Sequence, residues 1–174
     1  YELEVVITDQ ETTTTTTLNV EVDSNPNVAV HRYEAEKANY NGKSQKPHYG
    51  PSAGGRIRFR NNPGEYVEWT VDSDEGGPHE LLFGYGLSSS EIHLELKFNG
   101  NVLLPNMKYE GTGSEGSYTR SEGVPVTLKP GENKIRLTSL LEGAIVIDYL
   151  DVKVKASRPD LLSVNLYGYG QIVH

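Results

Sequence analysis

The sequence of 174 residues contains no cysteine and only one methionine and one tryptophan. Without cysteine the chain has no disulfide, no thiolate nucleophile and no cysteine-ligated zinc, so its stability must come from packing or from an oxygen-ligated metal. No apolar run approaches the roughly 18 residues of a membrane-spanning helix, and no basic-then-apolar signal pattern opens the chain. We therefore expect no membrane insertion, and a soluble piece cut from a longer protein.

Positive charge is also scarce, because 16 lysines and arginines face 24 acidic residues, for a net charge of −8. This balance argues against a nucleic-acid partner or an anionic membrane. One segment is an exception. Between Lys37 and Gly64 there are six basic residues and no acidic one, which leaves −14 on the rest of the chain.

Glycine and tyrosine, by contrast, are plentiful: the chain has 18 glycines, 9 prolines and 11 tyrosines. This composition is typical of strands joined by tight turns, and Asn99-Gly100 is a hairpin signal. Alternation predicts a core face for Val67, Trp69 and Val71. Short strands without helical periodicity predict an all-β fold, a jelly-roll β-sandwich. Strands are expected at residues 56–60, 65–72, 79–86, 92–98, 124–128, 132–138 and 144–154.

Composition shifts divide the chain into three parts. Residues 1–27 read as a hairpin, either the end of an upstream domain or a flange, followed by a linker through Asp23 to Asn27. Residues 28–156 hold the predicted sandwich. Residues 157–174 resume after Pro159 as an extension or a linker.

Three carboxylates suggest a cation. Glu34 and Glu36 are two apart on an expected strand and so share a face. Asp148 lies in a strand that is apolar on both sides, with Val146, Leu150 and Val152 expected on its own face and Ile145, Ile147 and Tyr149 on the other. A buried carboxylate needs a partner, either an arginine or a hard cation such as calcium. The alternative is a solvated glutamate pair with Asp148 capping a turn at the sheet rim.

Between Tyr33 and Val154 a series of short motifs appears in a defined order. They are YEAE, GGRIRF, EYVEWTV, LKFNGN, VTLKPGENKIRL and VIDYLDV. In this order they resemble the β-sandwich carbohydrate-binding modules of families six and thirty-five. The resemblance implies a structural calcium held by Glu34, Glu36 and Asp148, with carbonyls near Ala53 to Arg56. It also implies a polysaccharide partner and a secreted parent chain that carries a catalytic domain, a glycoside hydrolase or lyase.

Tyrosines in expected loops are the candidates for stacking on sugar rings. These are Tyr49 before the glycine-rich segment, and Tyr109 and Tyr118 after the hairpin; the polar candidates are Lys46, His48, Lys108, Arg120 and Glu142. The resembled family commonly places an asparagine before the closing strand, where this chain has Leu141-Glu142-Gly143. The ligand's identity therefore does not carry over. Each tyrosine has the alternative of a rim position with its hydroxyl in water.

An arginine row, Arg56, Arg58 and Arg60, alternates with inward Ile57 and Phe59. Arginine forks match carboxylate and sulfate oxygens, which favours an anionic polysaccharide, a uronate or a sulfated glycan. The alternative is that these arginines pair with neighbouring glutamates such as Glu65 and Glu68.

The sequence thus predicts a non-catalytic polysaccharide-binding module that targets an attached extracellular enzyme. A structural or adhesive sandwich is the first alternative. A small polysaccharide lyase or hydrolase is the second, because paired carboxylates can hydrolyse glycosides and His48-Tyr49 could exchange protons. No spaced histidine motif supports catalysis.

Overall fold

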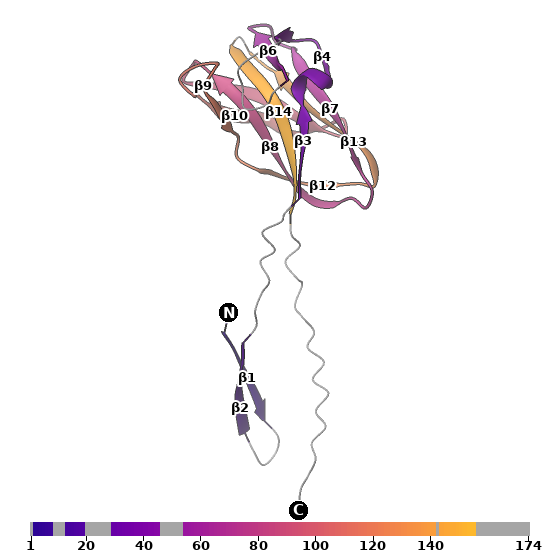
Figure 1. The fold of residues 1–174 in the computed structure, drawn as a ribbon, viewed down its shortest axis with the longest axis vertical. Helices are drawn as coiled ribbons and strands as arrows, with labels where there is room; N and C mark the ends of the chain where they lie inside the picture. Colours follow the sequence, from indigo (N-terminus) through magenta and orange to yellow (C-terminus); the bar gives the residue numbers. More distant parts are fainter. Residues whose placement is uncertain (1, 9–12, 20–28, 46–53, 142, 156–174) are drawn as a thin grey trace, which may run out of the picture.

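The computed structural model describes residues 2–8, 13–19, 29–45, 54–141 and 143–155. Residues 29–155 contain a two-layer β-sandwich (Figure 1). Its strands are β3 (Val30–Glu34), β4 (Asn39–Tyr40), β5 (Lys43–Gln45), β6 (Arg56–Arg60), β7 (Tyr66–Ser73), β8 (Gly77–Leu87), β9 (Glu91–Phe98), β10 (Asn101–Glu110), β11 (Tyr118–Arg120), β12 (Val124–Leu128), β13 (Gly131–Ser139) and β14 (Ala144–Val154). The all-β prediction is confirmed.

The two layers are antiparallel sheets. One has five strands in the order β10-β9-β13-β7-β4. The other has seven strands in the order β11-β8-β14-β6-β5, and it also includes β12 beside β8 and β3 beside β14. Figure 1 shows β14 between β8 and β3. The closing strand thus lies at the centre of its sheet.

Two tight turns join neighbouring strands, and the one at Asn99-Gly100 is where the sequence predicts it. Asn99 and Gly100 connect β9 to β10 with positive φ angles of 49° and 83°. Asparagine and glycine tolerate this left-handed region, which matches the twist of a two-residue hairpin. The Lys129-Pro130-Gly131 turn joins β12 to β13, where Gly131 has a φ of 83°.

The core fills the space between the two sheets. Val67, Trp69 and Val71 of β7 are all buried, which confirms the expected core face. The Trp69 ring lies 5.8 Å from the ring of Phe83 in the opposite sheet. Such contacts between facing layers are the main source of stability in a sandwich without disulfides.

The predicted faces of β14 are wrong beyond Asp148, because the strand contains a β-bulge there. The pairing of β14 with β8 shifts register between Ile147 and Tyr149, which leaves Asp148 as the extra residue. A bulge reverses the alternation of side chains from that point onward. The residues that reach the core are therefore Ile145, Ile147, Leu150 and Val152.

The N-terminal segment contains the expected hairpin. Strands β1 (Glu2–Thr8) and β2 (Thr13–Asn19) pair antiparallel, with Leu3 opposite Leu18. The hairpin's role as a flange or as part of an upstream domain stays a prediction, and residues 157–174 lie outside the described residues. The described segments hold one helix, the three-residue η1 (Ala35–Lys37), which is too short to cross a membrane.

Candidate functional site

The opening carboxylates lie where β3 ends and η1 begins. Glu34 is the last residue of β3, whereas Glu36 belongs to the 3-10 turn of η1. The prediction that both share a strand face is therefore wrong, because the chain turns between them. Each nevertheless has a buried Oε2 atom without a hydrogen-bond partner among the described residues. A buried carboxylate oxygen without a partner is costly, and a cation would satisfy it.

Asp148 lies next to this turn in the fold. Tyr149 is the register partner of Glu34, so the bulge residue is adjacent to the end of β3. Asp148 is completely buried and has interaction partners within the chain. At this point β14 changes neighbours from β6 to β3. The bulge thus places a carboxylate at the junction of three strands.

The donor set fits a hard cation in part. Carboxylate oxygens are calcium ligands, and Gly54 lies so close to Glu36 that a Cβ there would clash with its Oε1 atom. Within residues 29–45, 54–141 and 143–155, however, no three acidic or histidine side chains form a metal-binding cluster. Further oxygens would have to come from backbone carbonyls, as the expected contribution near Ala53 to Arg56 supposes.

The structure corrects the expected role of Tyr109. This residue lies on β10 rather than in a loop, and its side chain is 1% exposed. Its ring packs edge-on against Tyr85 at 4.9 Å, and burial raises its pKa well above the usual value. The stretch is rich in glycine only after Glu110, so the strand extends further than composition suggested. A fully buried ring is not available to stack on a sugar.

The other expected ligand residues fall into two groups. Lys46, His48, Tyr49 and Glu142 lie outside the described residues. Tyr118 and Arg120 are on β11, and Lys108 is on β10. Tyr118 is half-buried and accepts a hydrogen bond from Arg56 Nη1 at 2.8 Å. Burial raises the pKa of its hydroxyl.

The arginine row is largely neutralised by the chain itself. Arg58 donates from Nε and Nη2 to both carboxylate oxygens of Glu115, at 2.8–3.0 Å. Arg60 pairs with Glu65 at 3.1 Å, whereas Glu68 pairs with Arg136 instead. Arg56 donates to the side-chain oxygen of Gln45 at 2.7 Å. The arginines of this row are thus paired within the chain, as the alternative interpretation expected. Glu115 is a partner that the sequence had not suggested.

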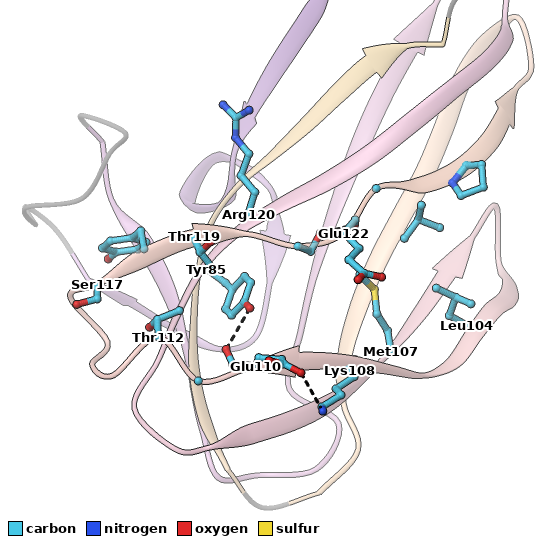
Figure 2. Close-up of a pocket in the computed structure, with 16 residues that line it drawn as sticks. Tyr85, Leu104, Met107, Lys108, Glu110, Thr112, Ser117, Thr119, Arg120 and Glu122 are labelled. Atoms are coloured by element: carbon cyan, nitrogen blue, oxygen red, sulfur yellow. Dashed lines mark hydrogen bonds and ion pairs between the residues drawn. The ribbon is translucent and has the colours of Figure 1, made fainter.

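A cleft lies between the edges of the two sheets (Figure 2). This edge cleft has a volume of about 840 Å³. One wall is β10 with the residues that follow it, the other is the segment from Ser117 to Pro125, and Tyr85 of β8 lies between them. Edge strands β10 and β11 thus frame a site that strand prediction alone does not reveal.

Charged groups in the edge cleft are mostly paired. Lys108 contacts Glu110 at 3.0 Å and Glu91 at 3.2 Å, and these hydrogen bonds raise its pKa. Figure 2 shows Arg120 pointing away from the cleft. It pairs with Asp151 on the outer face of the sheet, at 3.3 Å.

Sequence reasoning missed most residues of the cleft, among them Tyr85, Met107 and Glu122. Tyr85 and Met107 read as ordinary strand residues, and both are buried. Glu122 lies in a Ser-Glu-Gly loop without a motif around it. The only sequence signal was the glycine- and serine-rich stretch from Gly111 to Gly123, which predicts a loop but not what the loop faces.

Comparison with known proteins agrees with this fold. No family model matches the chain. An exo-β-D-glucosaminidase from Amycolatopsis orientalis is 29% identical over 106 residues, which is 60% of this chain. The chain spans about a tenth of that relative's length, because the match covers 10% of it.

A family 35 carbohydrate-binding module from Clostridium thermocellum superposes with a TM-score of 0.68 at 25% identity. The match covers 73% of this chain and 99% of that module. A Listeria monocytogenes protein, solved in complex with glucose, magnesium and calcium, has a TM-score of 0.63 at 21% identity, over 70% of this chain and 12% of that one. At this lower identity the match shows only that the two chains share a fold.

The described residues between 29 and 155 therefore form a β-sandwich like that of the family 35 carbohydrate-binding modules. Modules of this type are typical accessory domains of carbohydrate-active enzymes. The sandwich accounts for nearly the whole of the matched module, so the resemblance drawn from the motifs between Tyr33 and Val154 is confirmed.

Proposed function

We propose that this chain is a non-catalytic glycan-binding module of a larger, secreted carbohydrate-active enzyme. The observation that supports this most is the match to a complete, separate binding module, 99% of which is covered. The relative from Amycolatopsis orientalis is a glycosidase, but the chain corresponds to a tenth of it. A binding role beside a catalytic domain fits both facts.

The mechanism is targeting. By holding a polysaccharide, the module keeps the catalytic domain of the same chain at a raised effective concentration of its substrate. The length of the linker sets that concentration, and no chemistry is required of the module. Its own contribution is binding energy from a small number of apolar and polar contacts.

One structural calcium ion is part of the proposal. Its ligands are Glu34, Glu36 and Asp148, with backbone carbonyls near Ala53 to Arg56. The orphaned oxygens of the two glutamates and the burial of Asp148 support it. Bound there, the ion would tie the end of β3 to the closing strand β14, so its contribution is to stability.

The expectation of an anionic glycan depends on the arginine row. Because Arg58 and Arg60 are paired with Glu115 and Glu65, their charges are already offset. The geometry therefore gives the anionic ligand less support than the sequence did.

The test is a pull-down of the 174-residue chain on insoluble polysaccharides, run beside a turnover assay on the same panel. Retention on at least one polysaccharide without release of sugar is the expected result. Release of reducing ends would overturn the non-catalytic assignment. If no polymer retains the chain and none is hydrolysed, a structural or adhesive sandwich is favoured.

A further inference from the structure

We propose that the edge cleft is the groove that holds the glycan, that the glycan is uncharged, and that Glu122 is its specificity-determining contact. The inference rests on the proposed function, and it names the place and the ligand class. It differs from the sequence-based expectation in the ligand class, and in part in the place, since Tyr118, Lys108 and Arg120 of the expected site also line the cleft. The expected site lay on the loop tyrosines, and the expected ligand was anionic.

The shape of the cleft suits a short stretch of a glycan. Its volume of about 840 Å³ is within the range of ~300–1,000 Å³ for small-molecule sites. Apolar side chains line it, with Leu104 and Met107 on one wall and Val124 on the other. Sugar rings have apolar faces that pack on such surfaces, while polar groups at the rim bind the hydroxyls.

The charge of the cleft disfavours an acidic ligand. Its two cations are already paired, Lys108 with Glu91 and Glu110, and Arg120 with Asp151. The carboxylate of Glu122 has no hydrogen-bond or ion-pair partner among the residues that the structure describes; its backbone carbonyl accepts a hydrogen bond from the Ser121 hydroxyl at 2.9 Å. Figure 2 shows its side chain extending toward the wall that carries Met107. An unpaired carboxylate would repel a uronate or a sulfate.

The same carboxylate is well suited to a neutral sugar. An ionised carboxylate accepts hydrogen bonds through both oxygens, so it can receive the hydrogens of two neighbouring hydroxyls. Hydrogen bonds to a charged acceptor are stronger than neutral ones. Thr119 on the same wall is exposed, and its hydroxyl also has no partner among the described residues. The cleft thus offers free acceptors where a glycan offers donors.

The wall formed by β10 favours a glycan over a peptide. An added peptide strand needs a regular row of free backbone groups on an edge strand. Pro105 in β10 has no N–H to donate, and the pairing of β10 with β9 shifts register on both sides of Leu104. Such irregularities block strand addition. They leave side-chain binding of a sugar chain unaffected.

The experiment is a titration of the ¹⁵N-labelled 174-residue chain followed by NMR and calorimetry. The probes are neutral hexasaccharides of β-1,4-glucose, β-1,4-mannose and α-1,6-glucose, with a galacturonate hexamer and a glucosamine hexamer as charged probes. We expect at least one neutral probe to bind and to shift the amides of residues 104–112 and 117–125. Glu122→Gln should weaken that binding by about tenfold, since it removes the charge from a hydrogen-bond acceptor.

The matched control is Glu75→Gln, because Glu75 is also exposed but lies in the turn between β7 and β8, outside the cleft. It should bind with wild-type affinity. A neutral probe that shifts other residues and is indifferent to Glu122→Gln overturns the inference but leaves the proposed function standing. Binding of a charged probe alone also overturns the inference. Binding of no glycan, here or in the polysaccharide pull-down, overturns the proposed function itself.

Discussion

Arg32 donates two hydrogen bonds to Asp151, from Nε to Oδ1 at 2.7 Å and from Nη2 to Oδ2 at 2.8 Å. The two residues are direct partners in the ladder between β3 and β14. The guanidinium also lies 3.6 Å from the centroid of the Tyr149 ring. The hydrogen bonds to Asp151 raise the pKa of Arg32. This pair fastens the opening strand to the closing strand, two residues before Glu34.

Removing the buried half of this pair should destabilise the sandwich. Asp151 is 1% exposed, so Asp151→Ala leaves Arg32 beside Tyr149 without its carboxylate. We expect the free energy of unfolding in urea to fall by about 1.5–3 kcal/mol, the range for hydrogen bonds to charged groups. Asp72→Ala, at an exposed aspartate of β7, should change it by less than about 0.5 kcal/mol. Equal losses in the two variants would contradict the structural role of the pair.

Calcium should raise the melting temperature. At a free concentration 100-fold above its dissociation constant, an ion that binds only the folded state adds about 2.7 kcal/mol of stability. A chelator should therefore lower the melting temperature by several degrees, and Glu36→Gln should lower it without chelator and abolish the response. Calorimetry with elemental analysis of the purified chain measures both. An unchanged melting curve together with no bound metal rules out the ion.

The architecture was predictable because its signals are local. Alternation on β7 and the Asn99-Gly100 turn report the geometry of adjacent residues, and the sandwich follows from many such short segments. The faces of β14 were not predictable in the same way. The reversal at Asp148 depends on how β14 pairs with β8, and a sequence pattern of period two contains no sign of it.

The site was less predictable than the fold because it is formed by contacts between distant segments. Tyr109 was expected in a loop, although its neighbours in β10 continue the strand up to Glu110. The edge cleft brings residues near 107 together with residues near 122 and with Tyr85. Similarly, the pairing of Arg58 with Glu115 joins residues 57 positions apart. Composition identified the loop but not its partners.

Two substitutions of Tyr109 should separate the contribution of its ring to stability from that of its hydroxyl. Tyr109→Ala removes a fully buried ring, and we expect a loss of about 3–5 kcal/mol in the free energy of unfolding. Among the described residues, the hydroxyl donates to the Met107 sulfur at 3.4 Å, a weak acceptor, so Tyr109→Phe should cost less than about 1 kcal/mol. Urea unfolding measures both. A stable Tyr109→Ala variant that has lost glycan binding would restore the sugar-stacking role.

Acid should weaken the contact between Arg58 and Glu115. The hydrogen bonds from Arg58 hold the pKa of Glu115 below its usual value, and its side chain is about one-fifth exposed. A lowered folded-state pKa gives stability that is present above the unfolded-state value of 4.5 and is lost as pH falls through the folded-state value. Glu115→Gln should therefore be less stable than wild type by at most about 1 kcal/mol at pH 7.

The difference should vanish in acid, because protonated glutamate resembles glutamine. Urea unfolding at pH 7, pH 5 and pH 3 measures whether the free energies of unfolding of wild type and Glu115→Gln become equal. Glu75→Gln, which changes an exposed glutamate of a turn, serves as the control for a general effect of charge removal. A deficit in Glu115→Gln that persists unchanged at pH 3 would show that the contact does not depend on the ionised carboxylate.

Salt should distinguish the neutral glycan from the anionic one. If the arginine row bound an acidic glycan, affinity would fall as salt rises, because exposed charges are screened over about 10 Å at 0.1 M. The row is instead paired within the chain: Arg58 contacts Glu115, and Arg60 contacts Glu65. A ligand would have to break these pairs before it could use the guanidinium groups. We therefore expect affinity for the best neutral hexasaccharide to change less than twofold between low and high salt.

Substitution of one arginine in the row tests directly whether the row binds the glycan. Of the two ion-paired arginines in the row, Arg60 is the more exposed, with 48% of its side chain accessible. It lies outside the edge cleft. Arg60→Gln should leave glycan affinity within about twofold of wild type, since it removes a charge that the ligand does not contact. Calorimetric titration at two salt concentrations measures both effects. If affinity for the galacturonate hexamer dominates, falls with salt and drops in Arg60→Gln, the arginine row is the binding surface and the neutral cleft is not.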